Sequence, residues 1–396
     1  MTIELNQIST LFLALALLTL GTMLVRKVGF LQKFCIPAPV VGGLLFAFLA
    51  TILKYFNLLS FTLDTSLQNL FMLTFFTTVG LGASFRLIRL GGKLLMIYWA
   101  ACGFLALAQN AIGVSMSYIF GLHPLIGMMA GAVSMEGGHG GATAYGETLE
   151  SLGIDSALSI GIAAATFGLV AGGLIGGPIV KYLINKYDLK STEVEHEEAY
   201  SVESLEKPIN TDNFLTQTLL ITLCIAGGTF IGDLFSSATG FVMPGYVGAM
   251  FVAVIVRNIV DRVKEDAVHM TSINLIGDVS LGIFLSMALM SIKLWEVADL
   301  ALPLLLIVFV QVIFVALFAI FILFRLLGKD YDAAVMIAGF AGHSLGATPN
   351  AMANMAAVTG RYGPSRKAFL IVPIVGAFLI DVVSMPIIIT TINIFN

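Results

Sequence analysis

Twelve apolar stretches follow one another along this chain, and they limit what it can fold into more than any other feature. A helix of about 20 apolar residues covers the roughly 30 Å hydrocarbon core of a bilayer. Only 11% of the 396 residues are charged, whereas soluble domains carry about 25%. The sequence therefore predicts an all-α integral membrane protein and gives no sign of nucleic-acid binding. The stretches lie at roughly 8–26, 38–56, 67–86, 94–120, 124–149, 156–185, 214–238, 244–260, 271–292, 300–325, 332–358 and 367–395.

The N-terminal segment is expected to be a retained first span. It carries no Lys or Arg before its apolar run, and the first basic pair, Arg26 and Lys27, follows the run. A secretory signal has the reverse order. The three cysteines stand singly in apolar sequence, without the paired spacing of a zinc or redox site. We expect all three to be small buried side chains: Cys35, Cys102 and Cys224.

Two glycine-rich motifs interrupt the fifth and the eleventh stretch. They are residues 137–143 (GGHGGAT) and 342–348 (GHSLGAT). Glycine weakens a helix by about 1 kcal/mol relative to alanine, and unwound backbone facing lipid would leave its amides without partners. Each motif must therefore be buried in protein or line a cavity. The two motifs are the first candidates for a binding site.

The two halves of the chain resemble each other. Pro37 and Pro244 lie 207 residues apart, the two glycine motifs are separated by a similar distance, and Gln109 corresponds to Gln311. Weak similarity between halves is typical of transporters built from structural repeats. We expect a first repeat at 1–185, a linker at 186–213 and a second repeat at 214–396. The linker is acidic, and we interpret it as a solvated segment.

The placement of Lys and Arg predicts how the repeats are oriented. If 124–149 and 332–358 are re-entrant hairpins, each half crosses the membrane five times, and the second half is inverted. With the N-terminus outside, 18 of the 20 basic residues face the cytoplasm, and only Lys54 and Lys293 lie outside. Two fully crossing segments would lose this asymmetry. The sequence predicts two inverted-topology repeats, each of five transmembrane helices plus one hairpin. Both termini would then be outside, with the linker cytoplasmic and the tips meeting near mid-membrane.

The hairpin tips are expected to hold an anion. A helix N-terminus offers free amides and about half a positive charge, and no Lys or Arg falls within either motif. The alternative is that small residues only let helices pack closely, which we expect of Gly172, Gly173, Gly176 and Gly177. The polar residues and the repeated Gly-Ala-Thr favour a binding role. The substrate-binding candidates are Gly137, Gly138, His139, Gly140, Gly141, Thr143, His343, Ser344, Gly346, Ala347, Thr348, Asn350 and Asn354.

Ion coupling is expected at carboxylates inside the spans. Asp381 lies deep in the last span with Ser384 on the same helical face, and an ionised carboxylate there needs a partner. A protonated structural acid is the alternative for Asp381. Glu136 is a second candidate, although it lies equally well near the membrane surface. The candidate sodium ligands are Asp381, Thr143 and Thr348.

Several polar residues have a structural interpretation beside the functional one. His139 and His343 can donate hydrogen bonds to a carboxylate, but histidine in such a place is as often structural. Gln109, Asn110 and Gln311 are uncharged polar residues in long spans, where hydrogen bonding between helices is the usual role.

Several separate motifs together resemble the bacterial sodium/glutamate symporter family. They are residues 137–140 (GGHG), 163–178 (AAATFGLVAGGLIGGP), 293–296 (KLWE), 346–355 (GATPNAMANM) and 369–382 (FLIVPIVGAFLIDV). The resemblance covers nearly the whole chain. It implies sodium-driven uptake of L-glutamate through the bacterial inner membrane by a homodimer. Each protomer would then hold a scaffold part and a mobile, elevator-type transport part that carries both hairpins.

The resemblance also places the substrate and ion region on residues 137–143 and 342–354 and on Asp381. The chain departs from the family pattern at two places. Glu136 stands where a serine is usual, and Phe340 and His343 stand where the family has histidine and phenylalanine. These departures bear on the substrate and on the histidines, and not on the architecture.

Other functions remain open on the sequence. A carrier of another small carboxylate, or one coupled to protons, has the same features. A channel is disfavoured because no ring of charges or carbonyls is repeated by symmetry. An enzyme is disfavoured because Glu136-x-x-His139 lacks the second histidine of a zinc helix and the glycine motif lacks a phosphate-loop lysine. We therefore predict no enzymatic activity and no cofactor apart from Na⁺ as the coupling ion.

Overall fold

The computed structural model describes residues 2–33, 36–191, 208–241, 243–263, 267–292 and 300–396. Cys35, the linker glutamates between 193 and 206 and the 293–296 motif lie outside the described residues. The first half forms β1 (Thr2–Leu5), α1 (Gln7–Lys27), α2 (Gly29–Lys33), α3 (Ala38–Tyr55), β2 (Ser60–Leu63), α4 (Gln68–Gly82), α5 (Phe85–Ile119), α6 (Pro124–Met128), η1 (Met129–Val133), α7 (Gly138–Ser151) and α8 (Ala157–Tyr187).

The second half is helical throughout its described part. It forms α9 (Thr211–Thr239), α10 (Gly245–Val263), α11 (Met270–Met290), α12 (Ala301–Phe318), η4 (Ala319–Leu323), α13 (Phe324–Leu326), α14 (Tyr331–His343), α15 (Thr348–Tyr362), α16 (Arg366–Ile374), η5 (Val375–Leu379) and α17 (Ile380–Phe395).

In the described part of the chain, eight helices are long and apolar enough to cross a membrane. This confirms a multi-pass membrane protein. Two of the predicted spans fall short of that length or apolarity. The helix α4 has 15 residues, which is only about 22 Å at 1.5 Å per residue, and α10 carries Arg257, Asp261 and Arg262.

Two features depart from the predicted uniform helices. The strands β1 and β2 pair in parallel, with Thr2 opposite Ser60 and Leu5 opposite Leu63, so a small two-stranded sheet that the sequence did not predict is added to the predicted all-α membrane fold. Four-residue strands are too short to show a hydrophobic period. Three five-residue π-helical turns, η1, η4 and η5, also interrupt apolar stretches. Backbone geometry of this kind is common near functional sites.

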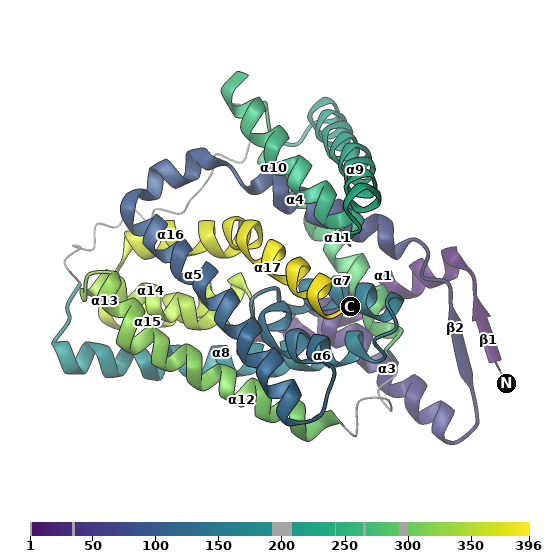
Figure 1. The fold of residues 1–396 in the computed structure, drawn as a ribbon, viewed down its shortest axis with the longest axis horizontal. Coiled ribbons are helices and arrows are strands. Elements are labelled where there is room, and N and C mark those ends of the chain that lie inside the picture. Colours follow the sequence, from purple (N-terminus) through teal and green to yellow (C-terminus); the bar gives the residue numbers. More distant parts are fainter. Residues whose placement is uncertain (1, 34–35, 192–207, 242, 264–266, 293–299) are drawn as a thin grey trace.

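The helices form two packed groups (Figure 1). In one group α1, α3, α4, α9, α10 and α11 pack on one another, and in the other α5 to α8 pack with α12 to α17. The first group has two apolar clusters of its own, one around Ala14 and Met287 and one around Leu81 and Cys224. Cys102 and Cys224 are buried, as predicted.

Glycines bring two helix pairs of the first group together in the same way. Between α1 and α3, a Cβ at Gly42 would meet the carbonyl oxygen of Leu17, and between α9 and α10 one at Gly248 would meet the carbonyl oxygen of Gly228. Small residues of this kind let backbones approach closely. Gly42 and Gly248 lie 206 residues apart, and each stands at a close contact between two helices.

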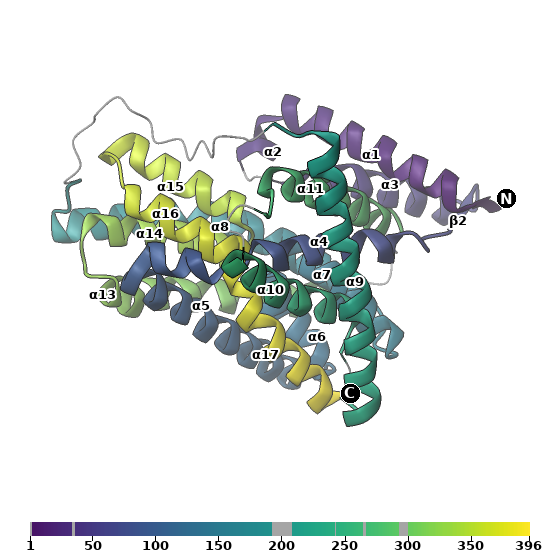
Figure 2. The ribbon, with the colours of Figure 1, turned by 90° about the horizontal axis from the view of Figure 1, so that it is seen from above.

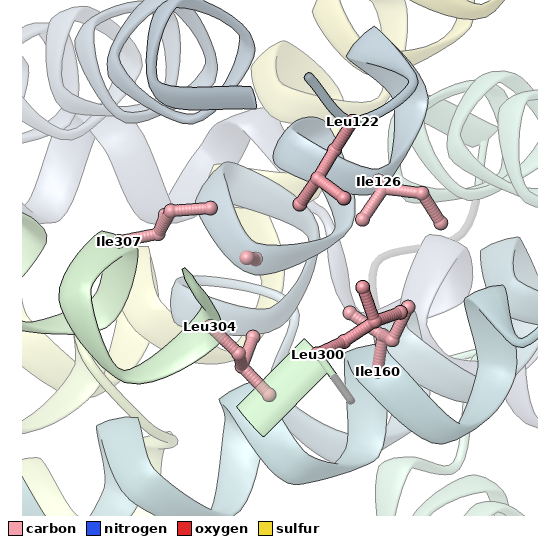
Figure 3. A pocket seen from close by; sticks show the side chains of 7 residues that line it. Leu122, Ile126, Ile160, Leu300, Leu304 and Ile307 are labelled. Atoms are coloured by element: carbon pink, nitrogen blue, oxygen red, sulfur yellow. The ribbon is translucent and has the colours of Figure 1, made fainter. Parts of the chain in front are cut away.

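Both ends of the first glycine-rich segment lie near the start of the long helix α8. Leu122 and Ile126 line a small apolar cavity together with Ile160, near the start of α8 (Figure 3). At the other end of the segment, the backbone amide of Leu158 donates a hydrogen bond of 3.1 Å to the Glu150 carboxylate. Both arms of the segment formed by α6, η1 and α7 therefore meet the N-terminal end of α8.

The second glycine-rich segment, α14 and α15, has both arms at the opposite end of α8. The Tyr331 hydroxyl at the start of α14 donates to the Gly363 carbonyl oxygen after α15, and the Ser191 hydroxyl beyond α8 donates to the Pro364 carbonyl oxygen at 2.7 Å. The rings of Tyr187 and Phe324 lie 5.3 Å apart at the same end. Figure 2 shows α14 and α15 beside α8. The two segments thus approach each other from opposite ends of one helix.

Packing of small residues along α8 holds the second segment. A Cβ at Gly172 would lie 2.9 Å from the carbonyl oxygen of Ala341, and one at Gly176 would meet the Asn354 amide. The packing role predicted for these two glycines is confirmed. It is wrong for Gly177, where an added Cβ meets nothing within 4 Å. All 13 residues of α14 are buried, so this broken helix forms the centre of the second group.

Candidate functional site

The tips of the two broken segments touch. The first break is a turn at Glu136 and Gly137, after which Gly138 restarts the helix with a φ of 55°. A Cβ at Gly138 would lie 2.8 Å from the carbonyl oxygen of Gly346, in the turn between α14 and α15 at the tip of the second segment. Glycine is required there for two reasons. A residue with a side chain rarely adopts this positive φ, and its Cβ would lie too close to the Gly346 carbonyl oxygen.

The first break is shorter than the glycine motif. Of the substrate-binding candidates in this motif, Gly140, Gly141 and Thr143 lie within α7. Gly140 faces Phe75 and Leu281 of the first helix group, and a Cβ added at Gly140 would lie 3.5 and 3.7 Å from their side chains. The motif therefore forms the tip at its start and a helix contact further on.

Amide side chains fasten the second tip to its surroundings. Asn350 donates to the Leu169 carbonyl oxygen at 2.7 Å, and Asn354 donates to the carbonyl oxygens of Gly172 and Ala338 at 3.0 and 3.2 Å. Both asparagines were candidates for substrate binding. Their amide nitrogens connect α15 to α8 and α14.

The second tip also satisfies its own polar groups. The Ser344 hydroxyl donates to the Phe340 carbonyl oxygen at 2.5 Å, within the last turn of α14. Ala347 is the extended residue before α15, and Thr348 is its first residue. The N-terminal end of α15 therefore lies at the tip, where its positive dipole end suits an anion.

Both candidate histidines are buried and have side-chain neighbours. His139 lies 3.0 Å from the Thr166 hydroxyl of α8. His343 lies 2.7 Å from the Tyr98 hydroxyl and packs on the ring of Phe340 at 5.6 Å between centroids. These contacts favour the structural interpretation of both histidines over direct substrate contact.

Two glutamines connect the second tip to the neighbouring helices, a role that the sequence predicts only in general terms. Gln109 of α5 donates to the Ser344 carbonyl oxygen at 2.9 Å, and Gln311 of α12 donates to the Gln109 carbonyl oxygen at 2.8 Å. Ser344 caps α14, where helical carbonyls lack intrahelical partners. Gln109 therefore stabilises the broken end itself. Their symmetric place in the repeat was the only sequence signal for this contact.

The carboxylate of Glu136 lies at the first tip and is buried. Neither of its oxygens has a hydrogen-bond partner among the described residues, and both are shielded from solvent. The negative charge of Glu136 interacts electrostatically with Tyr98 and Cys102 of α5, and Glu136 itself interacts with the negative charge of Asp381. The carboxylate of Glu136 therefore lies in the interior of the protein.

Asp381 lies on α17, next to η5, with Ser384 buried one turn further on. Its charge reaches Glu136 and Tyr145. Of the other sodium candidates, Thr143 has a buried hydroxyl without a partner among the described residues. Thr348 lies against Gly376 of η5, 3.3 Å from where a Cβ would be.

The arrangement combines two kinds of group at one place. The N-termini of α7 and α15 supply amides that suit carboxylates, and Glu136 and Asp381 supply negative charge that suits cations. The two tips, the carboxylates of Glu136 and Asp381, and Thr348 lie in one region. The side chains of His139, Asn350 and Asn354 make hydrogen-bonding contacts with neighbouring helices. A small zwitterion together with a cation fits these groups.

Residues 3–364 of the chain match the family described as Sodium/glutamate symporter. The sodium/glutamate symporter of Haemophilus influenzae is 42% identical over 381 residues, which is 95% of this chain and 94% of the relative. The sodium/glutamate symporters of Escherichia coli and Shigella flexneri are each 43% identical over 387 residues, with 96% of both chains covered.

Among solved structures, the sodium proton antiporter MjNhaP1 from Methanocaldococcus jannaschii is similar over 97% of this chain and 96% of its own, with a TM-score of 0.44 and 15% identity. That likeness is too distant to inform the site. The sequence relatives, in contrast, are aligned over nearly their whole length, and they confirm the resemblance that the motifs indicated. The chain belongs to the sodium/glutamate symporter family.

Proposed function

We propose that this protein is a secondary active transporter that carries L-glutamate into the cell together with Na⁺. The observation that carries the proposal is the contact of two broken-helix tips beside two carboxylates, in a chain whose relatives named sodium/glutamate symporters are 42–43% identical. A member of a symporter family is a transporter and not an enzyme. Na⁺ acts as the coupling ion, and the proposal includes no cofactor.

In this proposal, the carboxylates of the substrate face the amides at the start of α15 and α7. Sodium is held by Asp381, Thr143 and Thr348, with backbone carbonyls of the tips completing the oxygen shell, as at other broken-helix sites. Glu136 and Ser384 take part in ion coupling. The buried hydroxyl of Thr143 and the buried oxygens of Glu136, all without partners among the described residues, support these roles.

We propose further that the halves are inverted repeats at 1–185 and 214–396, each with five spans and one re-entrant hairpin. The matched glycine packing at Gly42 and Gly248 supports the repeat. The approach of the segments from opposite ends of α8 supports the inversion. Basic residues gather around the C-terminal end of α8 and its neighbours, which supports a cytoplasmic position of that end and of the linker 186–213. They are Lys181, Lys186, Arg325, Lys329, Arg361, Arg366 and Lys367.

The division into two packed helix groups, the first of which has two apolar clusters of its own, supports an elevator-type mechanism. The group with α5 to α8 and α12 to α17 holds both tips and would move as the transport part. The group with α1, α3, α4, α9, α10 and α11 would be the scaffold. Its exposed apolar side chains, such as Phe12, Phe230 and Ile255, suit contact with lipid and with a second protomer in a homodimer. The proposal also places the protein in the bacterial inner membrane, with both termini on the outside.

Uptake by purified protein in proteoliposomes tests the function directly. An inward sodium gradient should drive accumulation of labelled glutamate above its equilibrium level. Dissipating the gradient with a sodium ionophore should abolish the accumulation. Entry that stops at equilibrium under both conditions would indicate a channel and contradict the proposal.

Glu136 makes proton coupling the specific alternative. A buried carboxylate without partners is more stable when it is protonated or bound to a cation. If a proton gradient without sodium drove accumulation, protons would replace sodium as the coupling ion. Competition by unlabelled small acids in the same assay identifies the substrate that the site prefers.

A further inference from the structure

A short connection between α4 and α5 joins the two helix groups. The chain passes from one group to the other three times, after α4, after α8 and after α11, and the second and third passages include residues 192–207 and 293–299, which lie outside the described part of the chain. In the first passage only Ala83 and Ser84 separate the end of α4 from the start of α5. Any movement between the groups must therefore be absorbed in or near these two residues.

The connection is fastened to α10 of the first group by one amide side chain. The Asn258 amide nitrogen donates to the Ala83 carbonyl oxygen at 3.0 Å, and the Asn258 side-chain oxygen accepts from the Phe85 backbone amide at 2.7 Å. One side chain thus binds backbone groups on both sides of Ser84. These two bonds restrain the direction in which α5 begins.

A charged pair of α10 strengthens this attachment. Arg257 and Asp261 lie one turn apart, with 2.9 Å between Nε and the carboxylate, and their side chains are only 14% and 10% exposed. Arg257 donates to the Leu81 carbonyl oxygen at 3.1 Å, and the Ser84 hydroxyl donates to the Asp261 carboxylate. Charge-assisted hydrogen bonds of this kind are about twice as strong as neutral ones. The end of α4 and the start of α5 are therefore fixed to the first group.

The later part of α5 is held by the second group. The Trp99 ring nitrogen donates to the Leu379 carbonyl oxygen of η5 at 2.7 Å. One turn further on, a Cβ at Gly103 would lie 2.9 Å from the Val383 side chain of α17. The helix α5 therefore starts in contact with one group and continues in contact with the other.

Between these two sets of contacts, α5 is broken at Gly92. Its φ of 57° and ψ of −150° are not helical, and this combination is almost confined to glycine. Figure 1 shows the first turns of α5 running in a different direction from the rest of the helix. A Cβ at Gly92 would meet nothing within 4 Å. The backbone conformation, and not close packing, therefore requires glycine at this position.

We propose that Gly92 is the hinge about which the transport part moves, and that Arg257, Asn258 and Asp261 form the anchor that keeps the start of α5 with the scaffold. The inference rests on the proposed elevator-type movement and adds the residues that guide it. Hinges are a few residues that absorb large changes of φ and ψ. Rotation at Gly92 moves the rest of α5 with the tips, while α10 and the first turns of α5 stay in place.

The first test compares two glycines with similar backbone conformation. Gly92→Ala and Gly240→Ala each place a side chain at a positive φ, and nothing lies within 4 Å of either added Cβ. Gly240 caps α9, within the proposed scaffold. Gly92→Ala should lower the maximal rate of sodium-driven glutamate uptake about tenfold, because alanine favours one hinge position over the other. Gly240→Ala should lower the unfolding midpoint and leave the uptake rate within about twofold.

Glutamate binding separates a hinge from a damaged site. Titration calorimetry of the solubilised Gly92→Ala protein in sodium chloride should give a glutamate affinity within about threefold of wild type, because the substitution adds no contact with the tips. Uptake at the wild-type rate in Gly92→Ala, or an equal loss of uptake in Gly240→Ala, would overturn the hinge.

Spin-label distances test the anchor in proteoliposomes. Labels are attached at Phe85, Tyr118 and Val263, which are all exposed, in a variant with its three cysteines replaced by alanine. Pulsed electron paramagnetic resonance should give the same distance between Phe85 and Val263 with and without sodium and glutamate, whereas the distance between Tyr118 and Val263 should change. Asn258→Ala should broaden the distribution of the first distance, because it removes both bonds to the connection.

The outcomes separate the hinge from the proposed function. If Phe85 moved together with Tyr118 relative to Val263, the hinge would lie before α5, and the inference would be overturned. A constant distance between Tyr118 and Val263 would overturn the movement itself. A wild-type protein that accumulates no glutamate under a sodium gradient would overturn the proposed function instead.

Discussion

The two broken segments carry nearly the same glycine motif, yet the protein holds their tips in different ways. At the second tip, the amide nitrogens of Gln109 and Asn350 and the Ser344 hydroxyl each donate to a backbone carbonyl oxygen, and of these side chains only Gln109 has a buried oxygen without a partner among the described residues. At the first tip and in the helix that follows it, Glu136 and Thr143 have buried oxygen atoms without partners among the described residues. A buried polar group without a partner is costly unless a ligand satisfies it. The comparison indicates that the second tip is a fixed support and that the first tip is completed by what it binds.

Removing the charge of Asp381, beside the first tip, should reduce uptake more than any other change. Asp381→Asn removes a carboxylate that acts on Glu136, and we expect sodium-driven uptake to fall by more than about 100-fold, or about 2.7 kcal/mol. The protein should remain folded, because an amide replaces the carboxylate at the same size. Thermal unfolding and uptake by the same purified sample measure both quantities.

Asp278→Asn is the matched control for this change. Asp278 is an exposed carboxylate of α11, and its amide variant should transport as wild type. Sodium coupling that survived in Asp381→Asn would remove this residue from the ion site. The difference between the two tips would then depend on Glu136 alone.

Disturbing the contact between the two tips should give the next largest loss of uptake. Gly138→Ala places a side chain at a positive φ, which costs about 1–2 kcal/mol, and pushes its Cβ to within 2.8 Å of the Gly346 carbonyl oxygen. We expect uptake to fall about tenfold or more, since 1.4 kcal/mol corresponds to a factor of ten. Initial rates at saturating sodium and glutamate provide the measurement.

The control lies two residues further along the same motif. A Cβ at Gly140 would make ordinary contacts of 3.5 and 3.7 Å with Phe75 and Leu281. Gly140→Ala should therefore keep most of the activity and slightly stabilise α7. Equal loss in both variants would mean that the motif acts through general flexibility and not through contact between the tips.

Removing a hydrogen bond that supports the second tip should lower the thermal stability of the protein. Gln109→Ala leaves the buried Ser344 carbonyl oxygen without its donor, which costs about 1–3 kcal/mol, while the backbone carbonyl oxygen of residue 109 can still accept from Gln311. The unfolding midpoint of the detergent-solubilised protein should drop. Thr143→Val is the contrasting change at the first tip, because its hydroxyl has no partner to lose among the described residues.

For Thr143→Val we expect unchanged stability in the absence of sodium and a smaller stabilisation when sodium is added. If Gln109→Ala were as stable as wild type while Thr143→Val unfolded easily, the roles assigned to the two tips would be reversed. Thermal unfolding with and without sodium chloride, with choline chloride as the ionic control, distinguishes these outcomes.

The features that the sequence predicted share a local cause. Apolar length predicts spans, and glycine in such a span predicts a break, because both follow from the chemistry of a few neighbouring residues. Burial of Cys102 and Cys224 and the interhelical role of Gln109 follow in the same way.

Other features depend on residues that meet from distant parts of the chain. The restart of the helix at Gly138 is fixed by Gly346, and the pairing of Tyr145 with Tyr246 joins α7 to α10. No local pattern identifies such partners. The contacts of Asn350 and Asn354 could not be predicted for this reason, because an amide beside a glycine motif suits a ligand as well as it suits a backbone carbonyl.

The smallest effect is expected where the second tip already has redundant support. Tyr98→Phe removes the hydroxyl that lies 2.7 Å from the His343 ring nitrogen, while the ring keeps its edge-on contact with Phe340 at 6.0 Å between centroids. The loss of one buried hydrogen bond costs about 1 kcal/mol. The unfolding midpoint should fall by a few degrees, and the sodium dependence of uptake should not change. A large rise in the sodium requirement would instead place His343 and Tyr98 at the ion site, and the second tip would no longer be only a support.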